Sequence, residues 1–192
     1  MVNELATELF LKSAARASQL GCRVESVAGA QILDAGVNTR GSLQAGRVLA
    51  QLCMGTLAEI ALLPADPAVL ISNNQVHVQT DHAVMACLGS QYAGWPVSAD
   101  DYFAMGSGPM RLCRGREETL KQLNLSESAA GPVVGILESE SLPTASAIEL
   151  IAQQCGVSTT DLRLAIAPST CIAGSYQVVA RSIETAMHKL HE

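Results

Sequence analysis

Arg181 and Glu184 are three residues apart, near the end of the chain, in a segment that has the periodicity of a helix. Residues at positions i and i+3 are neighbours on a helix, so the two side chains are expected to share one face. A guanidinium beside a carboxylate can fix its rotamer and lower its pKa, which keeps the acid ionised near a cation. The same spacing is typical of an exposed salt bridge worth about 0.2–0.5 kcal/mol, so spacing alone leaves both interpretations open.

Two histidines share the expected helix face of Glu184. Glu184, His188 and His191 follow one another at spacings that could be taken for a set of metal ligands. The His-Glu-x-x-His order of zinc hydrolases is absent. A metal-dependent hydrolase that uses His188 and His191 is therefore the weaker hypothesis.

A second acid, Glu138, follows the apolar run 133–137. That run is typical of a buried strand, and α/β proteins bind their ligands at the carboxyl ends of such strands. The alternative interpretation of Glu138 is a strand-end residue that caps the next helix.

A glycine-rich turn at Gly106, Ser107 and Gly108 joins an expected strand to an expected helix, and Pro109 fits the first helical position. Free N–H groups at such a turn could hold an anion. The lysine and the spacing of a nucleotide-binding loop are missing, so a nucleotide site is a weak prediction. A tight structural turn is the alternative.

Asp81 is a good N-cap residue for a short helix expected over 83–88. His82 follows it and is typical of a histidine at the surface or at a pocket edge.

Taken in order, these segments resemble the methenyltetrahydromethanopterin cyclohydrolases, which serve one-carbon metabolism in methanogens and in some bacteria that oxidise formaldehyde. The resemblance runs from about residue 33 to the end of the chain, and its most specific part is the string Tyr102–Pro109. The other matching strings are Gly36-Val37-Asn38, Cys53-Met54-Gly55, Thr80-Asp81-His82, Gly89-Ser90-Gln91 with Ala93-Gly94-Trp95, Leu137-Glu138-Ser139 and Lys189-Leu190-His191-Glu192.

The resemblance implies a homotrimeric enzyme that hydrolyses the cationic amidine of a reduced pterin and uses neither a metal nor a prosthetic group. The product implied is the 5-formyl derivative. The resemblance assigns Glu184 as the base and cation partner, with Arg181 beside it and Glu138 as the second carboxylate. The implied substrate-binding residues are Asp81, His82, Ser90, Gln91, Tyr92, Gly106, Ser107 and Gly108.

Two features depart from the family pattern. The family chains are longer, and members from methanogens often have lysine at the position of Tyr92. The last helical segment reaches Glu192 without a glycine or proline stop signal, which predicts that the natural protein continues or has been cut. The alternative function is therefore a non-catalytic fragment of that enzyme that binds the pterin or serves assembly.

The elements that must position these residues alternate between helical and strand patterns, which predicts a mixed α/β layered fold. The polar stretch 124–130 predicts a linker between an N-terminal α/β domain, 1–127, and the start of a second α/β domain, 128–192. Helices are expected over 3–20, 43–54, 83–88, 110–123, 144–155 and 174–191, and the helix over 110–123 is expected to have a charged outer face. Strands are expected over 22–27, 31–34, 56–63, 76–80, 102–105, 132–138 and 162–167.

The composition excludes several classes of protein. The 192 residues contain 12 Lys and Arg against 18 Asp and Glu, a net charge of −6 that disfavours nucleic acid and suits a cationic ligand. No apolar run reaches the length of about 18 residues that a membrane span needs. The acidic start of the chain predicts no signal peptide. The six cysteines contain no CxxC pair, which predicts reduced core thiols in a cytoplasmic protein.

Overall fold

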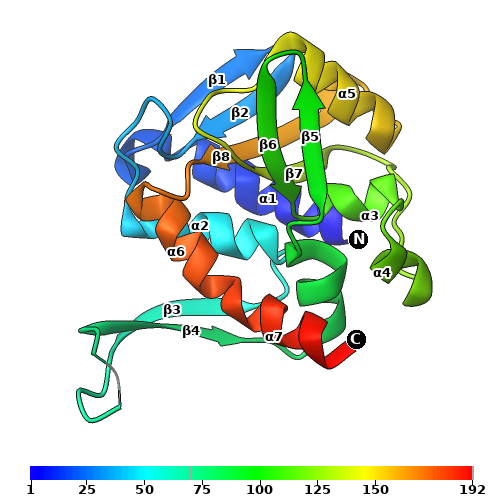
Figure 1. Ribbon diagram of the computed structural model, residues 1–192. Coiled ribbons are helices and arrows are strands. Elements are labelled where there is room, and N and C mark those ends of the chain that lie inside the picture. Colours follow the sequence, from blue (N-terminus) through cyan, green and yellow to red (C-terminus); the bar gives the residue numbers. More distant parts are fainter. Residues whose placement is uncertain (70, 192) are drawn as a thin grey trace.

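The computed structural model describes residues 1–69 and 71–191, and these form a mixed α/β fold as predicted (Figure 1). Its centre is a six-stranded sheet in the order β1-β2-β8-β7-β6-β5. The strands are β1 (Arg23–Val27), β2 (Ala30–Asp34), β5 (Trp95–Ala99), β6 (Tyr102–Ser107), β7 (Val133–Glu138) and β8 (Leu162–Ala167). A separate antiparallel pair, β3 (Glu59–Pro64) and β4 (Asn74–Gln79), lies below the sheet in Figure 1.

The central strands β7 and β8 are parallel and are buried on both faces of the sheet. This explains why 133–137 is an unbroken apolar run rather than an alternating one. Val133 and Leu137 pack against one helical layer, whereas Val134 and Ile136 pack against the other. The pleat thus places the two helical layers on opposite faces of the sheet and leaves Glu138 at its carboxyl edge.

The first layer holds α5 (Ala145–Cys155) and α3 (Met110–Arg114), and the second holds α1 (Val2–Ala14) and α2 (Leu43–Cys53). A third apolar cluster joins α2 to β3, to the π-helix η2 (Val84–Gln91) and to the helices α6 (Ile172–Ala180) and α7 (Ser182–His191). It therefore brings the last two helices of the chain to the end of η2.

Several element predictions are wrong in detail. The helix expected over 3–20 ends at Ala14 and is followed by a 3-10 turn, η1 (Ala17–Leu20). The helix expected over 110–123 is two short helices, α3 and α4 (Glu118–Gln122), because Gly115 adopts the left-handed conformation with φ 59° and ends α3. The strand β5 was not expected. A further 3-10 turn, η3 (Thr159–Asp161), precedes β8.

The helix expected over 174–191 also divides in two. It begins at Ile172, and the junction between α6 and α7 is at Arg181. The Arg181 N–H is shared between the carbonyls of Gln177 and Val178, at 3.0 and 3.1 Å, which tightens the last turn of α6. Glu192, the last residue of the closing sequence string, lies outside the described residues.

The predicted boundary between residues 127 and 128 falls in the segment that joins α4 to β7, and it stays a prediction. Strands from both sides of that boundary belong to the same sheet, since β7 pairs with β6 and β8 pairs with β2. Within residues 1–69 and 71–191, no helix has both the length and the apolar character that crossing a bilayer requires.

Candidate active site

An ion pair links the end of β7 to the junction of the last two helices. The Nη2 atom of Arg181 lies 3.1 Å from Oε2 of Glu138, and both side chains are mostly buried, at 18% and 27% exposure. The expectation that Arg181 pairs with Glu184 is therefore corrected. Arg181 instead binds an acid on the sheet, because the turn between α6 and α7 directs its guanidinium toward the edge of β7.

Glu184 lies in the first turn of α7, and only 4% of its surface is exposed. Among the described residues, no hydrogen-bond donor contacts its Oε1 atom. Burial raises the pKa of Glu184, and the charges of His188, Arg181 and Arg111 lower it to a smaller extent. The expected net lowering of this pKa is thus wrong, since loss of hydration outweighs the nearby positive charges. A carboxylate of raised pKa is a stronger proton acceptor once it is ionised.

Four of the predicted substrate-binding residues meet around the buried thiol of Cys53. Ser107 Oγ lies 3.2 Å from Cys53 Sγ, and Ser90 Oγ donates to the carbonyl of Cys53 at 2.7 Å. The Gly108 N–H donates to the carbonyl of Ser90 at 2.8 Å. Gln91 is fully buried, and its Nε2 donates at 3.4 Å to the carbonyl of residue 180, next to Arg181.

These contacts change the interpretation of the glycine-rich turn. The Gly108 N–H was expected to be free for a ligand, but it is already bonded to Ser90. Gly108 has φ 89°, a conformation that favours glycine, and this allows β6 to turn directly into α3. Gly106 packs so closely that a Cβ there would lie 2.7 Å from Cε of Met110. Among the residues that the structure describes, the contacts of this turn serve to position the end of η2.

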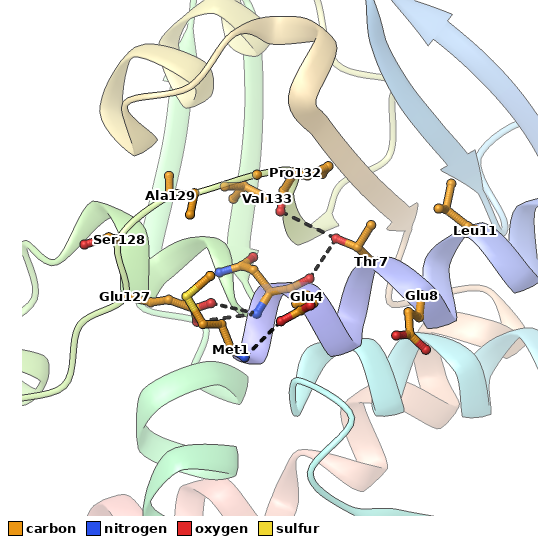
Figure 2. A pocket seen from close by; sticks show the side chains of 13 residues that line it. Met1, Glu4, Thr7, Glu8, Leu11, Glu127, Ser128, Ala129, Pro132 and Val133 are labelled. Atoms are coloured by element: carbon orange, nitrogen blue, oxygen red, sulfur yellow. Dashed lines mark hydrogen bonds and ion pairs between the residues drawn. The ribbon is translucent and has the colours of Figure 1, made fainter.

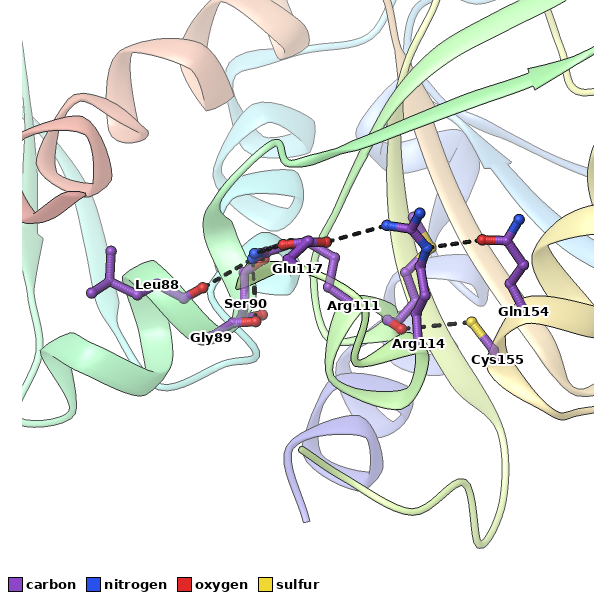
Figure 3. Close-up of polar contacts among 9 residues, drawn as sticks. Leu88, Gly89, Ser90, Arg111, Arg114, Glu117, Gln154 and Cys155 are labelled. Carbon is purple, nitrogen blue, oxygen red and sulfur yellow. Dashed lines mark hydrogen bonds and ion pairs between the residues drawn. The ribbon is translucent and has the colours of Figure 1, made fainter. Parts of the chain in front are cut away.

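Sequence reasoning missed the residue that holds the end of η2. Arg111 was expected on a charged outer face, but it is completely buried. Its Nη1 donates to the carbonyls of Leu88, Gly89 and Ser90 at 3.1, 3.2 and 3.2 Å, and its Nε donates to Glu117 at 2.8 Å (Figure 3). The chain carries no local signal for this role, because the three carbonyls lie more than twenty residues upstream.

One further residue, Gln177, contacts the thiol at the centre of the cluster without having been predicted. Gln177 Nε2 lies 3.4 Å from Cys53 Sγ, and the thiol donates to the carbonyl of Gln91 at 3.6 Å. Burial raises the pKa of Cys53, so the thiol stays protonated and neutral. A sequence signal for Gln177 exists, since it lies on the polar stripe that also contains Arg181 and Glu184.

Tyr92 closes the end of η2 and contacts α7. Its ring is stacked on the imidazole of His188, with centroids 4.7 Å apart and planes inclined by 15°. The guanidinium carbon of Arg111 lies 5.1 Å from the centroid of the Tyr92 ring. Tyr92 is thus placed next to the helix that carries Glu184.

Asp81 and His82 lie apart from this cluster. Both are exposed, and they line a shallow hollow of about 320 Å³ beside the start of β3 and the end of β4. Asp81 is not the N-cap that was predicted, because η2 begins after Ala83 without a side-chain cap. Within the described residues, no hydrogen bond or ion pair links Asp81 or His82 to Glu184, Arg181 or Glu138, and their part in binding stays a prediction.

Another groove, of about 450 Å³, lies between α1 and residues 127–133 (Figure 2). It shares no residue with the cluster around Glu184. Its acids have partners of their own: Glu8 pairs with Lys12 at 3.5 Å, and Glu127 accepts from the N–H of Asn3 at 3.1 Å. These acids therefore have structural roles in the groove. Across residues 1–69 and 71–191, no three His, Cys, Asp or Glu side chains are grouped closely enough to hold a metal ion.

Known proteins resemble this chain over its whole length. Residues 1–192 match the family model described as Cyclohydrolase (MCH). The chain is 56% identical over 168 residues to a methenyltetrahydromethanopterin cyclohydrolase of Rhodopirellula baltica. The aligned residues make up 86% of this chain and 50% of the relative. It is 39% identical over 196 residues to one of Methylobacillus flagellatus, with 99% and 58% covered.

A third relative is also similar to this chain. The methenyltetrahydromethanopterin cyclohydrolase of Methanococcoides burtonii is 42% identical over 163 residues, which cover 84% of this chain and 50% of the relative. The chain therefore spans about half the length of the relatives it matches. The match over residues 1–192, together with these identities, confirms the resemblance, and the chain belongs to the cyclohydrolase (MCH) family.

Proposed function

We propose that this chain supplies the catalytic side chains of a methenyltetrahydromethanopterin cyclohydrolase in one-carbon metabolism. The reaction adds water to the cyclic amidine of 5,10-methenyltetrahydromethanopterin and gives 5-formyltetrahydromethanopterin, reversibly. The names of the relatives support the substrate class. The observation that carries the proposal is the buried Glu184 carboxylate, one helical turn from an Arg181 side chain that is tied to Glu138.

The charge at this site suits the substrate. The amidinium bridge is a cation, and its carbon is already electrophilic, so a positioned carboxylate base is sufficient to activate water. The approach of the cation favours the ionised form of Glu184, which offsets the burial that raises its pKa. We accordingly propose that the reaction needs neither a metal nor a prosthetic group. The activity is expected to survive exhaustive chelation.

The steps conserve atoms and charge. Glu184 takes a proton from water as the water oxygen bonds to the bridging carbon, which gives a neutral adduct. The bond from that carbon to N10 then breaks while Glu184 returns its proton to N10. The hydroxyl proton of the adduct is released, which leaves a formyl group on N5. The cation and one water thus yield a neutral product and one proton.

We assign Arg181 and Glu138 to holding the reacting groups in place. Arg181 cannot serve as an acid at neutral pH, because a guanidinium does not lose its proton there. Its ion pair with Glu138 fixes the junction before Glu184 and keeps a second carboxylate beside the cation. We also propose contacts to the pterin from Asp81, His82, Ser90, Gln91, Tyr92, Gly106 and Ser107, whereas Gly108, whose N–H is bonded to Ser90, positions the end of η2.

We further propose a cytoplasmic homotrimer that binds neither nucleic acid nor a membrane. The six cysteines of the chain are all free thiols, which supports a reducing compartment. The net charge of −6 disfavours binding to phosphate backbones. Light scattering after size exclusion tests the trimer, and a monomer would contradict it.

The experiment that tests the function is incubation of the whole protein with 5,10-methenyltetrahydromethanopterin. The expected result is loss of the methenyl absorbance together with formation of the 5-formyl product in stoichiometric amount. An unchanged substrate spectrum beside an active relative would contradict the proposal.

A further inference from the structure

Three side chains from separate elements form a stack beside the site. The Tyr92 ring contacts the His188 imidazole, at 4.7 Å between centroids, and the Arg111 guanidinium, at 5.1 Å from its centroid. Tyr92 follows η2, His188 belongs to α7 and Arg111 belongs to α3. Stacked and cation–π contacts of this kind are attractive. The stack therefore joins three elements that are far apart in the sequence.

The Arg111 end of this stack is fixed. Its guanidinium is buried, donates to three consecutive carbonyls of η2 and is paired with Glu117 (Figure 3). With this many partners the side chain has one arrangement, so it is a rigid base on which the Tyr92 ring lies.

The other end of the stack is His188 on α7, the helix that carries Glu184. His188 is one helical turn after Glu184, and Glu184 is the buried residue of α7 among those described. Ile183 and Met187 pack the same helix onto the third apolar cluster, but both are only partly buried. A contact on His188 therefore limits the rotation and the tilt of α7, which determine where the Glu184 carboxylate lies.

The absence of a side chain at Gly94 leaves space for the Tyr92 ring. A Cβ atom on Gly94 would lie 2.5 Å from Cε1 and 2.7 Å from Cδ1 of Tyr92. Any side chain at position 94 must therefore displace the ring or shift the backbone, so the position of Tyr92 depends on glycine there.

We propose that Tyr92 is a positioning residue for Glu184. Its ring contacts both Arg111 and His188 and in this way holds α7 against the end of η2. This inference rests on the proposed cyclohydrolase function, and it gives Tyr92 a role that needs the ring and not the hydroxyl group. It also gives His188 a role that needs a flat ring.

The kinetic test compares Tyr92→Ala with Tyr92→Phe in the whole protein. Misplacement of a catalytic group by about 1 Å can cost about 100-fold, so the alanine variant is expected to lose 10- to 100-fold in kcat with little change in KM. The phenylalanine variant keeps the ring and is expected to lose far less kcat than the alanine variant, and Gly94→Ala is expected to act like the alanine variant. A loss in Tyr92→Phe equal to that in Tyr92→Ala would overturn the proposal, as would a parental kcat in Tyr92→Ala.

The partner in the stack is tested with His188→Phe and His188→Ala, and the control is Leu190→Ala on the exposed face of the same helix. The control is expected to retain kcat, and the phenylalanine variant is expected to lose less kcat than His188→Ala. Equal losses in both variants at position 188 would show that the imidazole itself is needed, which contradicts the proposal.

The pH profile separates positioning from simple loss of fold. Glu184 is faced by His188 on α7, Arg181 at the junction, Arg111 on α3 and Cys87 on η2. Loosening of α7 hydrates the carboxylate, so the acid limb of kcat is expected to move to lower pH in Tyr92→Ala and to stay in Tyr92→Phe. An unmoved limb in Tyr92→Ala would contradict the proposal.

A spectroscopic measurement keeps this inference independent of catalysis. The ring current of Tyr92 is expected to shift the His188 ring protons upfield in the NMR spectrum, and this shift should vanish in Tyr92→Ala and persist in Tyr92→Phe. If the parent protein shows this shift but no turnover, the proposed function fails while the stack stands. If the shift is absent from the parent, the positioning role fails whatever the activity.

Discussion

Arg181 reaches from the junction of α6 and α7 to Glu138 at the end of β7, with 3.1 Å between Nη2 and Oε2. The pair joins two segments that are 43 residues apart in the chain. Glu184 lies one turn beyond Arg181, so the position of the proposed base depends on a contact made by a different residue. This relationship leads to the first prediction.

Removal of either partner of the Arg181–Glu138 pair is expected to slow the reaction. Arg181→Gln and Glu138→Gln should each lower kcat by about 10- to 100-fold, because each releases the junction before Glu184. The double variant should be little worse than the poorer single variant, since both lose the same contact. Steady-state kinetics of the four proteins measures this coupling, and fully additive losses would contradict it.

Replacement of Glu184 by glutamine is expected to stabilise the fold at neutral pH. The folded-state pKa of Glu184 is raised by burial, so the folded state prefers the protonated acid. The contribution of this residue to stability is complete below pH 4.5 and is lost as the pH rises through the raised pKa. Urea unfolding should therefore show Glu184→Gln to be more stable than the parent at pH 7 and equal to it below pH 4.5. A less stable variant at pH 7 would contradict the burial argument.

Arg111 is expected to matter for stability far more than an exposed arginine. Breaking a buried ion pair leaves an uncompensated charge, so Arg111→Met should cost about 3–5 kcal/mol in the free energy of unfolding. The matched control is Arg23→Gln, whose partner is Glu25 and whose side chain is 65% exposed, and it should cost less than about 1 kcal/mol. Similar costs for the two variants in urea denaturation would show that Arg111 does not hold η2.

Four thiols of raised pKa are expected to be slow to react. Burial raises the pKa of Cys22 and Cys87 to about 11 and the pKa of Cys113 and Cys155 to about 12. Thiolate is the reactive form, so at pH 8 these four should be modified slowly by a disulfide reagent in the native protein and at once after unfolding. Mass mapping of the labelled positions measures this, and prompt native labelling of Cys155 would contradict the packing described.

The sequence predicted what depends on neighbours along the chain. The strands β1, β2, β7 and β8 and the helices α2 and α5 all follow from local periodicity, and they are confirmed. The helix over 110–123 is wrong because the left-handed conformation of Gly115 overrides the helical pattern around it. The partners of Arg111 and Arg181 could not be predicted from the sequence. They are distant along the chain, and only the folded structure brings them close to the arginine.

The central claim is that Glu184 is the base, and the most direct measurement compares kcat of Glu184→Gln with the parent in the whole protein. The control is Glu149→Gln, on α5 and outside the site. The account predicts that Glu184→Gln loses about 10²–10⁴-fold in kcat while it stays folded, and that the control keeps the parental rate. A folded Glu184→Gln protein that turns over the methenyl substrate at the parental rate would contradict the account.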